Sequence, residues 1–338
     1  MNVVITGGAG FLGSRLAREL LAAGSLDVAG GGPRPLSRLT LIDQAPVPPD
    51  LAADGRVTAI QGDLGQLLDP LASGPATLAA AEVIFHLAAA VSGECEADFD
   101  LGIRANLRAT EALLASCRAL GTSPVVVFSS SLAVYGGSED LPLPSVVDDQ
   151  TRPNPQTSYG AQKAMSEQLL ADYTRKGFLR GRALRLVSVS VRPGRPNAAA
   201  SGFMSGVIRE PLAGQRATCP VDPATEVALA SPAKAIAGLR CAATASDQAW
   251  GGRSAVNLPA LTVSVANMAA ALTRVAGPEV SALIDWTPDP VVARIVAGWP
   301  ARVRAGRAAR LGLTPDPDFD SIVRMHLAES RPGGDDGR

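Results

Sequence analysis

Short apolar segments alternate with amphipathic ones over the first half of the chain. The segment Asn2–Thr6 is predicted to be a strand, and Phe11–Ala23, with leucines at helical spacing, is predicted to be a helix. Further predicted strands are Leu39–Ile42, Val57–Ile60, Val83–His86, Val125–Ser129 and Ala183–Val189, and further predicted helices are Ala97–Leu120 and Ser158–Lys176. Strands separated by helices pair in parallel through right-handed crossovers. The pattern therefore predicts an α/β fold with a Rossmann-type, doubly wound parallel sheet.

The pattern becomes less regular after about Pro193, where prolines interrupt short predicted helices at Ala233–Ala243, Val263–Val275 and Pro290–Ala297. We expect residues 1–190 to form the sheet domain and residues 191–328 to form a smaller C-terminal α+β cap that binds substrate and can interleave with that domain. Residues 329–338 are polar and rich in glycine, which predicts a disordered tail. The glycine- and proline-rich residues 24–37 are predicted to form a long loop.

The composition is that of an ordinary globular protein. Its 338 residues are 46% hydrophobic, and 31 Lys and Arg residues nearly balance 32 Asp and Glu residues. This balance gives no electrostatic basis for binding nucleic acid or an anionic membrane, and no apolar run reaches the roughly 18 residues of a membrane span. The four cysteines are scattered, without a CxxC pair or a Cys/His cluster, so we expect neither a disulfide nor a metal site. With no secretory signal before the first predicted strand, these features predict a cytoplasmic protein.

A glycine-rich motif, TGGAGFLG at residues 6–13, joins the first predicted strand to the first predicted helix. Glycine lets the backbone turn tightly and lets a pyrophosphate approach bare N–H groups, and the helix N-terminus favours an anion. Such a motif can also be a structural turn, but its place between a strand and a helix favours a bound dinucleotide. The expected contacts are Gly7, Gly10, Phe11, Leu12 and Gly13.

An acidic residue, Asp43, ends the predicted strand that follows this motif. A carboxylate there can accept hydrogen bonds from the adenosine ribose hydroxyls and would repel a 2′-phosphate, which favours NAD over NADP. The alternative is an ordinary turn residue or helix cap. Asp63 and Leu64, just beyond the next strand, are expected to contact the adenine, although Asp63 can equally be a helix cap.

The motif YGAQK at residues 159–163 places a phenol and an ammonium group one helical turn apart. A phenol is a poor base at neutral pH, but a nearby lysine favours the phenolate, which can then take a proton from an alcohol. The chain has only three tyrosines and three lysines, so this spacing has a low chance of arising by accident. Tyr159 and Lys163 are therefore predicted to be catalytic.

A row of serines ends the predicted strand at residues 125–129 and continues to Ser131. Side chains at the carboxyl end of a central strand point into the crevice where such sheets bind ligands, so a serine there can hold a substrate oxygen. The alternative is that a serine caps the turn that follows.

Together these motifs identify a family resemblance. TGGAGFLG, Asp43, GDL at 62–64, HLAA at 86–89, SSSLAVYG at 129–136 and YGAQK occur in the order seen in extended short-chain dehydrogenases/reductases, the NAD-dependent epimerase/dehydratase family. The resemblance covers about residues 1–195. It implies that Ser131 is the catalytic serine, that Tyr159 is the acid/base, and that Lys163 is its partner and also holds the nicotinamide ribose. His86 then belongs to a structural strand end.

The same resemblance implies further contacts to NAD. These are Leu87, Ala88, Ala89, Asn106, Ser129 and Val189. It also implies a homodimer formed through the helices predicted at Ala97–Leu120 and Ser158–Lys176, although their apolar stripes could equally pack in the core.

The second half departs from family members that act on nucleotide-diphosphate sugars. Residues 225–232, TEVALASP, lack the arginine and acidic-aromatic pattern that addresses the nucleotide. A short proline-rich loop instead carries Arg192, Arg195 and Asn197, and a guanidinium group matches a carboxylate in a bidentate fashion. We therefore expect these three residues, with Ser131 and Tyr159, to bind a small hydroxy acid. The alternative is that the arginines pair with acidic residues of the protein.

The segment around this loop resembles a subgroup that oxidises the C2 hydroxyl of the four-carbon sugar acid D-erythronate with NAD, giving the 2-oxo acid. The leading hypothesis is therefore an NAD-dependent sugar-acid dehydrogenase. Two other functions stay open: an epimerase or dehydratase that retains its NAD, and a non-catalytic NAD-binding regulator.

Overall fold

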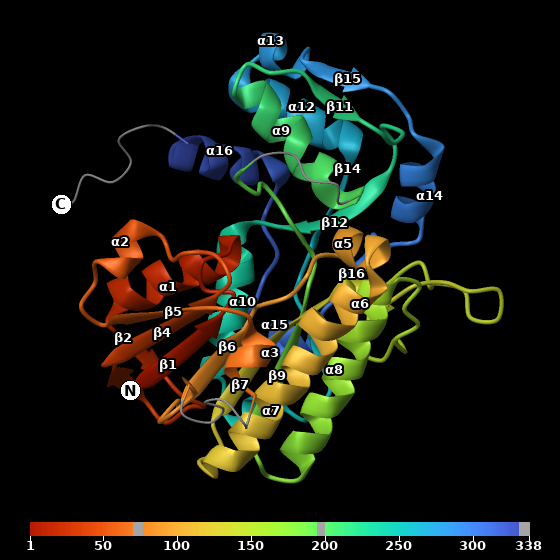
Figure 1. Cartoon of the computed structure of the whole chain (residues 1–338). Coiled ribbons are helices and arrows are strands. Elements are labelled where there is room, and N and C mark those ends of the chain that lie inside the picture. Colours follow the sequence, from red (N-terminus) through yellow and green to blue (C-terminus); the bar gives the residue numbers. More distant parts are fainter. Residues whose placement is uncertain (70–76, 195–199, 331–338) are drawn as a thin grey trace.

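A seven-stranded parallel sheet forms the centre of the protein, in a computed structural model that describes residues 1–69, 77–194 and 200–330 (Figure 1). The strand order is β13–β9–β7–β6–β1–β4–β5, and every neighbouring pair is parallel. The strands are β1 (Asn2–Thr6), β4 (Arg38–Asp43), β5 (Val57–Gln61), β6 (Val83–His86), β7 (Val125–Ser131), β9 (Arg180–Leu186) and β13 (Val256–Asn257). The order reverses direction beside β1, as in a doubly wound sheet, which confirms the predicted fold class.

Helices cover both faces of this sheet. On β1, Val3 and Ile5 pack in one core with α1 and α10, whereas Val4 packs on the opposite face with α7 and α8. This alternation is the period of a strand, and both of its faces are apolar because both are covered. The covering helices are α1 (Phe11–Ala23), α10 (Pro232–Thr244), α7 (Ala109–Leu120) and α8 (Ser158–Arg175).

A smaller α+β part lies at the carboxyl ends of the strands, at the top of Figure 1, and has its own apolar core. Its strands are β10 (Ser188–Val189), β12 (Glu226–Ala230) and β14 (Leu261–Ser264) in one sheet, and β11 (Ala217–Cys219) and β15 (Ile284–Trp286) in another. Its helices are α9 (Phe203–Leu212), α12 (Val265–Ala276), α13 (Pro278–Ser281), α14 (Pro290–Ala297) and α16 (Phe319–Ser330). The sequence predicts such a smaller α+β part, and its role in substrate binding stays a prediction.

The chain passes back and forth between the two parts. After β12 it returns to the sheet domain for α10 and β13, and the two-residue strand β13 completes the large sheet beside β9. Another short strand, β16 (Val303–Arg304), pairs with β8 (Val147–Asp148). The remaining short elements are α2 (Pro49–Ala52), α3 (Leu64–Leu67), α5 (Ser92–Ala97), α6 (Phe99–Gly102), η1 (Ile103–Arg108), η2 (Leu132–Val134), η3 (Ala200–Gly202), α11 (Asp247–Trp250) and α15 (Gly306–Arg310).

Three local predictions need correction. Residues 24–37 are not simply a loop, because β2 (Ser25–Asp27) and β3 (Pro33–Pro35) form a hairpin there. The predicted helix Ala97–Leu120 contains a π-helical turn, η1, between α6 and α7. Residues 329 and 330, predicted to begin a disordered tail, complete α16, and the rest of that tail lies outside the described residues. Within the described ranges, no helix has the combination of length and apolarity that crossing a membrane requires.

Candidate active site

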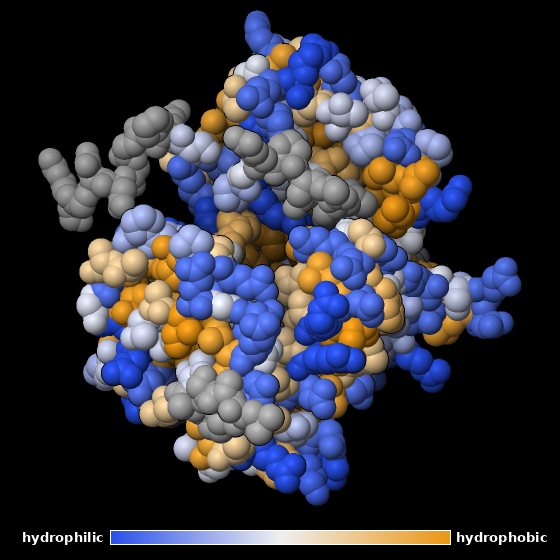
Figure 2. All heavy atoms as spheres, in the orientation of Figure 1, coloured by the Kyte–Doolittle hydropathy of each residue, from blue (hydrophilic) through white to orange (hydrophobic). Residues whose placement is uncertain are grey.

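A cavity of about 1300 Å³ separates the carboxyl ends of the sheet strands from the cap. Figure 2 shows this hollow, with apolar residues on its floor between the lower and upper parts of the molecule. It is large enough for a dinucleotide together with a small substrate, and its position follows the general rule for ligand sites in doubly wound sheets.

The glycine motif forms one wall of this cavity. Gly7 has a φ of +73°, and a Cβ atom there would lie 2.8 Å from the backbone nitrogen of Ala88. A Cβ atom on Gly13 would lie 2.0 Å from the carbonyl oxygen of Gly7. Gly10 caps α1 without a side-chain hydrogen bond, and the first turn of α1 carries no acidic residue. No side chain caps the N–H groups of this turn, so they are suited to a pyrophosphate.

Asp43 lies at the end of β4 and lines the same cavity. One carboxylate oxygen accepts a hydrogen bond from the backbone of Ala9 at 2.9 Å, and the other accepts one from Ala45 at 3.0 Å. The carboxylate is thus fixed beside the glycine motif, where it can meet ribose hydroxyls. Asp63 caps α3 through the backbone of Gln66, as the alternative expected, and it also lines the cavity; its contact with the adenine stays a prediction.

His86 lies at the end of β6 but does not line the cavity. Its Nδ1 is 2.7 Å from the Thr6 hydroxyl, and its Nε2 is 2.9 Å from the Thr110 hydroxyl, which itself donates to the Asn106 carbonyl. This series of hydrogen bonds assigns the proton of the His86 ring to Nε2 and leaves Nδ1 as an acceptor. Burial lowers the pKa of His86 to about 3, with Lys163 adding to the effect. The ring is therefore a neutral structural group, as the family resemblance implies.

Ser131, Tyr159 and Lys163 come together at the carboxyl end of β7. The Thr157 side chain caps the N-terminus of α8, which places Tyr159 in the first turn and Lys163 in the second. The Nζ of Lys163 donates to the carbonyl of Ser129 at 2.9 Å and lies 5.5 Å from the centre of the Tyr159 ring. All three predicted catalytic side chains line the cavity.

The acid–base properties of this group are strongly perturbed. Burial raises the pKa of the Tyr159 phenol to about 12, Cys95 adds to the rise, and hydrogen bonding to Ser131 and the charge of Arg192 act against it. Burial lowers the pKa of Lys163 to about 8, against the influence of Cys95 and Glu167. Opposite shifts of an acid and a base in one cleft are typical of a site for proton transfer. An added positive charge beside the phenol would favour its ionised form.

Arg192 follows β10 and enters the cavity from the cap side. Its Nε donates to the carbonyl of Val189 at 3.1 Å, and its own carbonyl accepts from Arg209 at 2.7 Å. Its guanidinium group forms no ion pair with an acidic side chain of the described ranges, so the expected alternative of an internal partner is not observed there. The other two predicted substrate residues, Arg195 and Asn197, lie outside the described residues.

The predicted cofactor contacts meet in this cavity with one exception. Those that line it are Gly7, Gly10, Phe11, Leu12, Gly13, Asp43, Asp63, Leu64, Leu87, Ala88, Ala89, Ser129, Tyr159, Lys163 and Val189. Asn106 is buried behind the wall, in the π-helical turn η1. Its amide holds both backbone groups of Ala90 and donates to Gln162 at 2.8 Å, so it shapes the loop after β6.

Several lining residues were missed from the sequence. The cap contributes Ser201, Met204 and Trp299, and the mouth includes Glu96, which accepts a hydrogen bond from the backbone of Ser158 at 2.6 Å. None belongs to a motif. Trp299 offers a weak signal, as one of three tryptophans in the chain, but nothing in its local sequence places it at a ligand site.

The match to a family model decides the classification. Residues 3–227 match the model of the NAD dependent epimerase/dehydratase family. The chain belongs to this family. It is an oxidoreductase and its cofactor is NAD, in agreement with the glycine motif and Asp43.

Full-length relatives are also known. The chain is 50% identical to D-erythronate dehydrogenase of Cupriavidus necator, across 98% of this chain and 99% of that protein. It is 38% identical to D-erythronate dehydrogenase of Haemophilus influenzae, across 97% and 99%. A crystal structure described as a nucleoside-diphosphate-sugar epimerase from Agrobacterium tumefaciens is 40% identical and superimposes with a TM-score of 0.89, covering 99% of this chain and 95% of that one.

Proposed function

We propose that this protein oxidises the C2 hydroxyl of a small sugar acid, D-erythronate or a close relative, to the 2-oxo acid with NAD. The observation that carries the proposal is a half-buried arginine, Arg192, that lines the same cavity as Tyr159 and has no acidic partner among the described residues. The two relatives named D-erythronate dehydrogenase, which match over almost their whole length, support it.

Arg192 suits the carboxylate of such a substrate. Burial lowers the pKa of its guanidinium group, and the charge of Arg209 adds to this effect. The guanidinium charge has therefore lost water, and no acidic side chain of the described residues takes the place of that water. A charge held in this way is stabilised when an anion replaces the missing water. A substrate carboxylate on Arg192 would bring its neighbouring hydroxyl toward Tyr159, since both side chains line the same cavity.

The other residues divide the chemistry between them. The Ser131 hydroxyl holds the substrate oxygen, and Tyr159 removes the proton from it. Lys163 supplies positive charge that favours the phenolate. Bound NAD supplies the hydride acceptor, and its own positive charge adds to that of Lys163. The glycine motif and Asp43 would hold the pyrophosphate and the adenosine ribose, and Lys163 the nicotinamide ribose.

The test is NADH formation at 340 nm with D-erythronate, with its reduced neutral analogue erythritol as comparison. We expect activity with the acid and an efficiency at least about 100-fold lower with the polyol, because the polyol leaves the Arg192 charge unpaired. Arg192→Gln should reduce kcat/KM for the acid by a similar factor and leave the polyol almost unaffected. Absence of turnover on any four- to six-carbon aldonate would contradict the proposal.

A second function is favoured by one observation, the description of the Agrobacterium structure as a nucleoside-diphosphate-sugar epimerase. An epimerase of this kind retains NAD and returns the hydride. Purified protein that carries one NAD per chain, and that interconverts a nucleotide sugar without net NADH formation, would establish this function instead.

We also propose that the protein is a cytoplasmic homodimer. Phe99 on α6 and Met165 on α8 expose 61% and 41% of their surface, although each belongs to an apolar stripe on a helix. A second copy would cover this face. The four cysteines of the chain are all free thiols, which suits a reducing compartment such as the cytoplasm. Phe99→Glu should convert the dimer to a monomer in analytical ultracentrifugation, and an unchanged mass would contradict this interface.

A further inference from the structure

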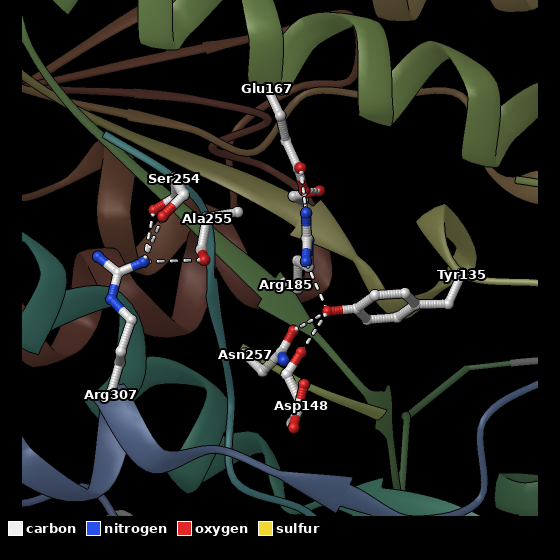
Figure 3. Close-up of polar contacts among 9 residues, drawn as sticks. Tyr135, Asp148, Glu167, Arg185, Ser254, Ala255, Asn257 and Arg307 are labelled. Atoms are coloured by element: carbon white, nitrogen blue, oxygen red, sulfur yellow. Dashed lines mark hydrogen bonds and ion pairs between the residues drawn. The ribbon is translucent and has the colours of Figure 1, made fainter. Parts of the chain in front are cut away.

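A buried ion pair lies behind the catalytic side chains and has no part in the chemistry described so far. Arg185 on β9 donates from Nε and Nη2 to the two carboxylate oxygens of Glu167 on α8, at 2.8 and 2.7 Å. The side chains retain only 7% and 3% of their exposure, so both charges are removed from water. Figure 3 shows the guanidinium group of Arg185 between Glu167 and the Tyr135 hydroxyl.

Glu167 connects the two elements that carry the catalytic residues. It lies one helical turn beyond Lys163 on α8, and its carboxylate also accepts a hydrogen bond from Ser130 at 2.5 Å. Ser130 stands on β7 between Ser129, whose carbonyl binds Lys163, and Ser131. Two successive turns of α8 are therefore joined to two successive residues of β7. These bonds set the position of the helix along the strand.

Arg185 is itself fixed from the other side. Its Nη1 donates to the Tyr135 hydroxyl, which lies 3.0 Å from Oδ1 of Asn257 and 3.2 Å from the carbonyl of Asp148 (Figure 3). Because its donors are held by Tyr135, which follows η2, as well as by Glu167 on α8, the guanidinium group has one orientation. Glu167 is thereby prevented from turning toward Lys163 to form a direct ion pair.

The charges around Lys163 give Glu167 a second effect. His86 on β6 is neutral, because burial lowers its pKa to about 3. Cys95 on α5 is a neutral thiol near pH 7, because burial raises its pKa. Tyr159 on α8 is likewise protonated in the protein without cofactor, since its pKa is about 12. Among the described residues, the negative charge that acts on Lys163 near neutrality is therefore that of Glu167.

We propose that Glu167, held in place by Arg185, is a positioning residue of the oxidation, which sets α8 against β7 and keeps Lys163 in its ammonium form. The proposal rests on the proposed catalytic roles of Tyr159 and Lys163. Glu167 itself is not among the described residues that line the cavity. It acts through Ser130 by geometry and through Lys163 by charge, and these two effects can be measured separately.

The effect of charge is tested directly on Lys163 by NMR. The chain has three lysines, so protein labelled with 13C at lysine Cε gives three signals, and the signal of Lys163 is assigned by its loss in Lys163→Met. We expect Glu167→Gln to lower the titration midpoint of Lys163 by about one pH unit, a tenfold change in the ratio of ammonium to amine. Glu167→Asp, which keeps the charge, should restore the midpoint toward that of the native protein. An unchanged midpoint in Glu167→Gln would overturn this part of the proposal.

A matched control comes from the same strand. Arg182, also on β9, pairs with Asp247, so Asp247→Asn removes the acidic partner of a buried arginine away from the catalytic side chains. It should leave the Lys163 midpoint unchanged. Where Glu167→Gln is too unstable to study, Glu167→Gln combined with Arg185→Gln removes both charges and should still lower the midpoint. A shift of equal size in Asp247→Asn would show a general structural effect and overturn the proposal.

The effect of geometry is tested with Ser130→Ala, which removes one hydrogen bond and no charge. We expect kcat to fall about tenfold through misplacement of Tyr159, with the Lys163 midpoint unchanged. A kcat equal to that of the native protein would exclude the positioning role. The NMR measurement needs neither substrate nor turnover, so its result is valid even if the protein does not oxidise sugar acids. Failure of the positioning role and failure of the proposed function can therefore be told apart.

Discussion

The ammonium group of Lys163 lies 5.5 Å from the centre of the Tyr159 ring, and burial shifts the pKa values of the two groups in opposite directions. Each shift favours the neutral form, so the protein without cofactor keeps its proton on the phenol. Positive charge must be added at this site before Tyr159 can act as a base at neutral pH. If Tyr159 is the base, as we propose, proton removal depends on the positive charge that the bound cofactor adds.

Replacing Tyr159 by phenylalanine tests its role as the base. The substitution removes the phenolic oxygen and keeps the ring that Lys163 approaches, so we expect kcat to fall by a factor of about 10²–10⁴. NADH binding, followed by fluorescence, should stay close to that of the native protein. A variant that retains most of its kcat would assign the base to another group.

The parts of this site that were predictable are those that depend on neighbours in sequence. Gly7 and Gly13 are required by a turn of a few residues, and Tyr159 and Lys163 share a face because a helix repeats every 3.6 residues. The position of Asp43 was predictable because this residue ends a single strand, β4. Each of these patterns is complete within about ten residues, so the sequence alone specified them.

The parts that were missed depend on distant segments. The Tyr135 hydroxyl meets Asn257 across 122 positions, and β13, which carries Asn257, is too short to give a periodic signal. Glu167 and Arg185 look like ordinary charged residues of a helix and a strand until the fold buries them together. Asn106 was expected at the cofactor, but the π-helical turn directs its amide to Ala90. Sequence periodicity does not reveal such a turn.

Substituting alanine for Gly13 should disable the cofactor site. The new Cβ atom would lie 2.0 Å from the Gly7 carbonyl oxygen, so the glycine motif must move. We expect NADH binding to be lost and the free energy of unfolding to fall by about 3 kcal/mol. Gly24→Ala, at the other end of α1, is the control: its φ is +63° but its Cβ would meet nothing within 4 Å, so the cost should be about 1 kcal/mol with normal NADH binding. Equal losses in both variants would contradict the steric argument.

Asp43→Ser should weaken the preference for NAD over NADP. The carboxylate would face the 2′-phosphate of NADP, and removing that repulsion should reduce the ratio of kcat/KM values for NAD and NADP by at least about tenfold. Efficiency with NAD should fall as well, because the backbone of Ala9 loses its acceptor at 2.9 Å. Steady-state rates with the two cofactors give the ratio. An unchanged ratio would mean that another residue selects the cofactor.

His86 should make the stability of the protein fall in acid. Burial lowers its pKa from 6.5 to about 3 in the folded state, so the unfolded chain binds the additional proton between these values. The neutral ring contributes its full stability above pH 6.5, and this is lost as the pH falls, with a slope of about 1.4 kcal/mol per pH unit from this one group. Urea unfolding between pH 7 and 4 measures the slope, and His86→Gln should reduce it by that amount.

His326→Gln is the control: burial also lowers the pKa of His326, but Glu329 opposes the shift, so the slope should change less. Equal slopes in the native protein and His86→Gln would show that His86 is not held neutral by the fold.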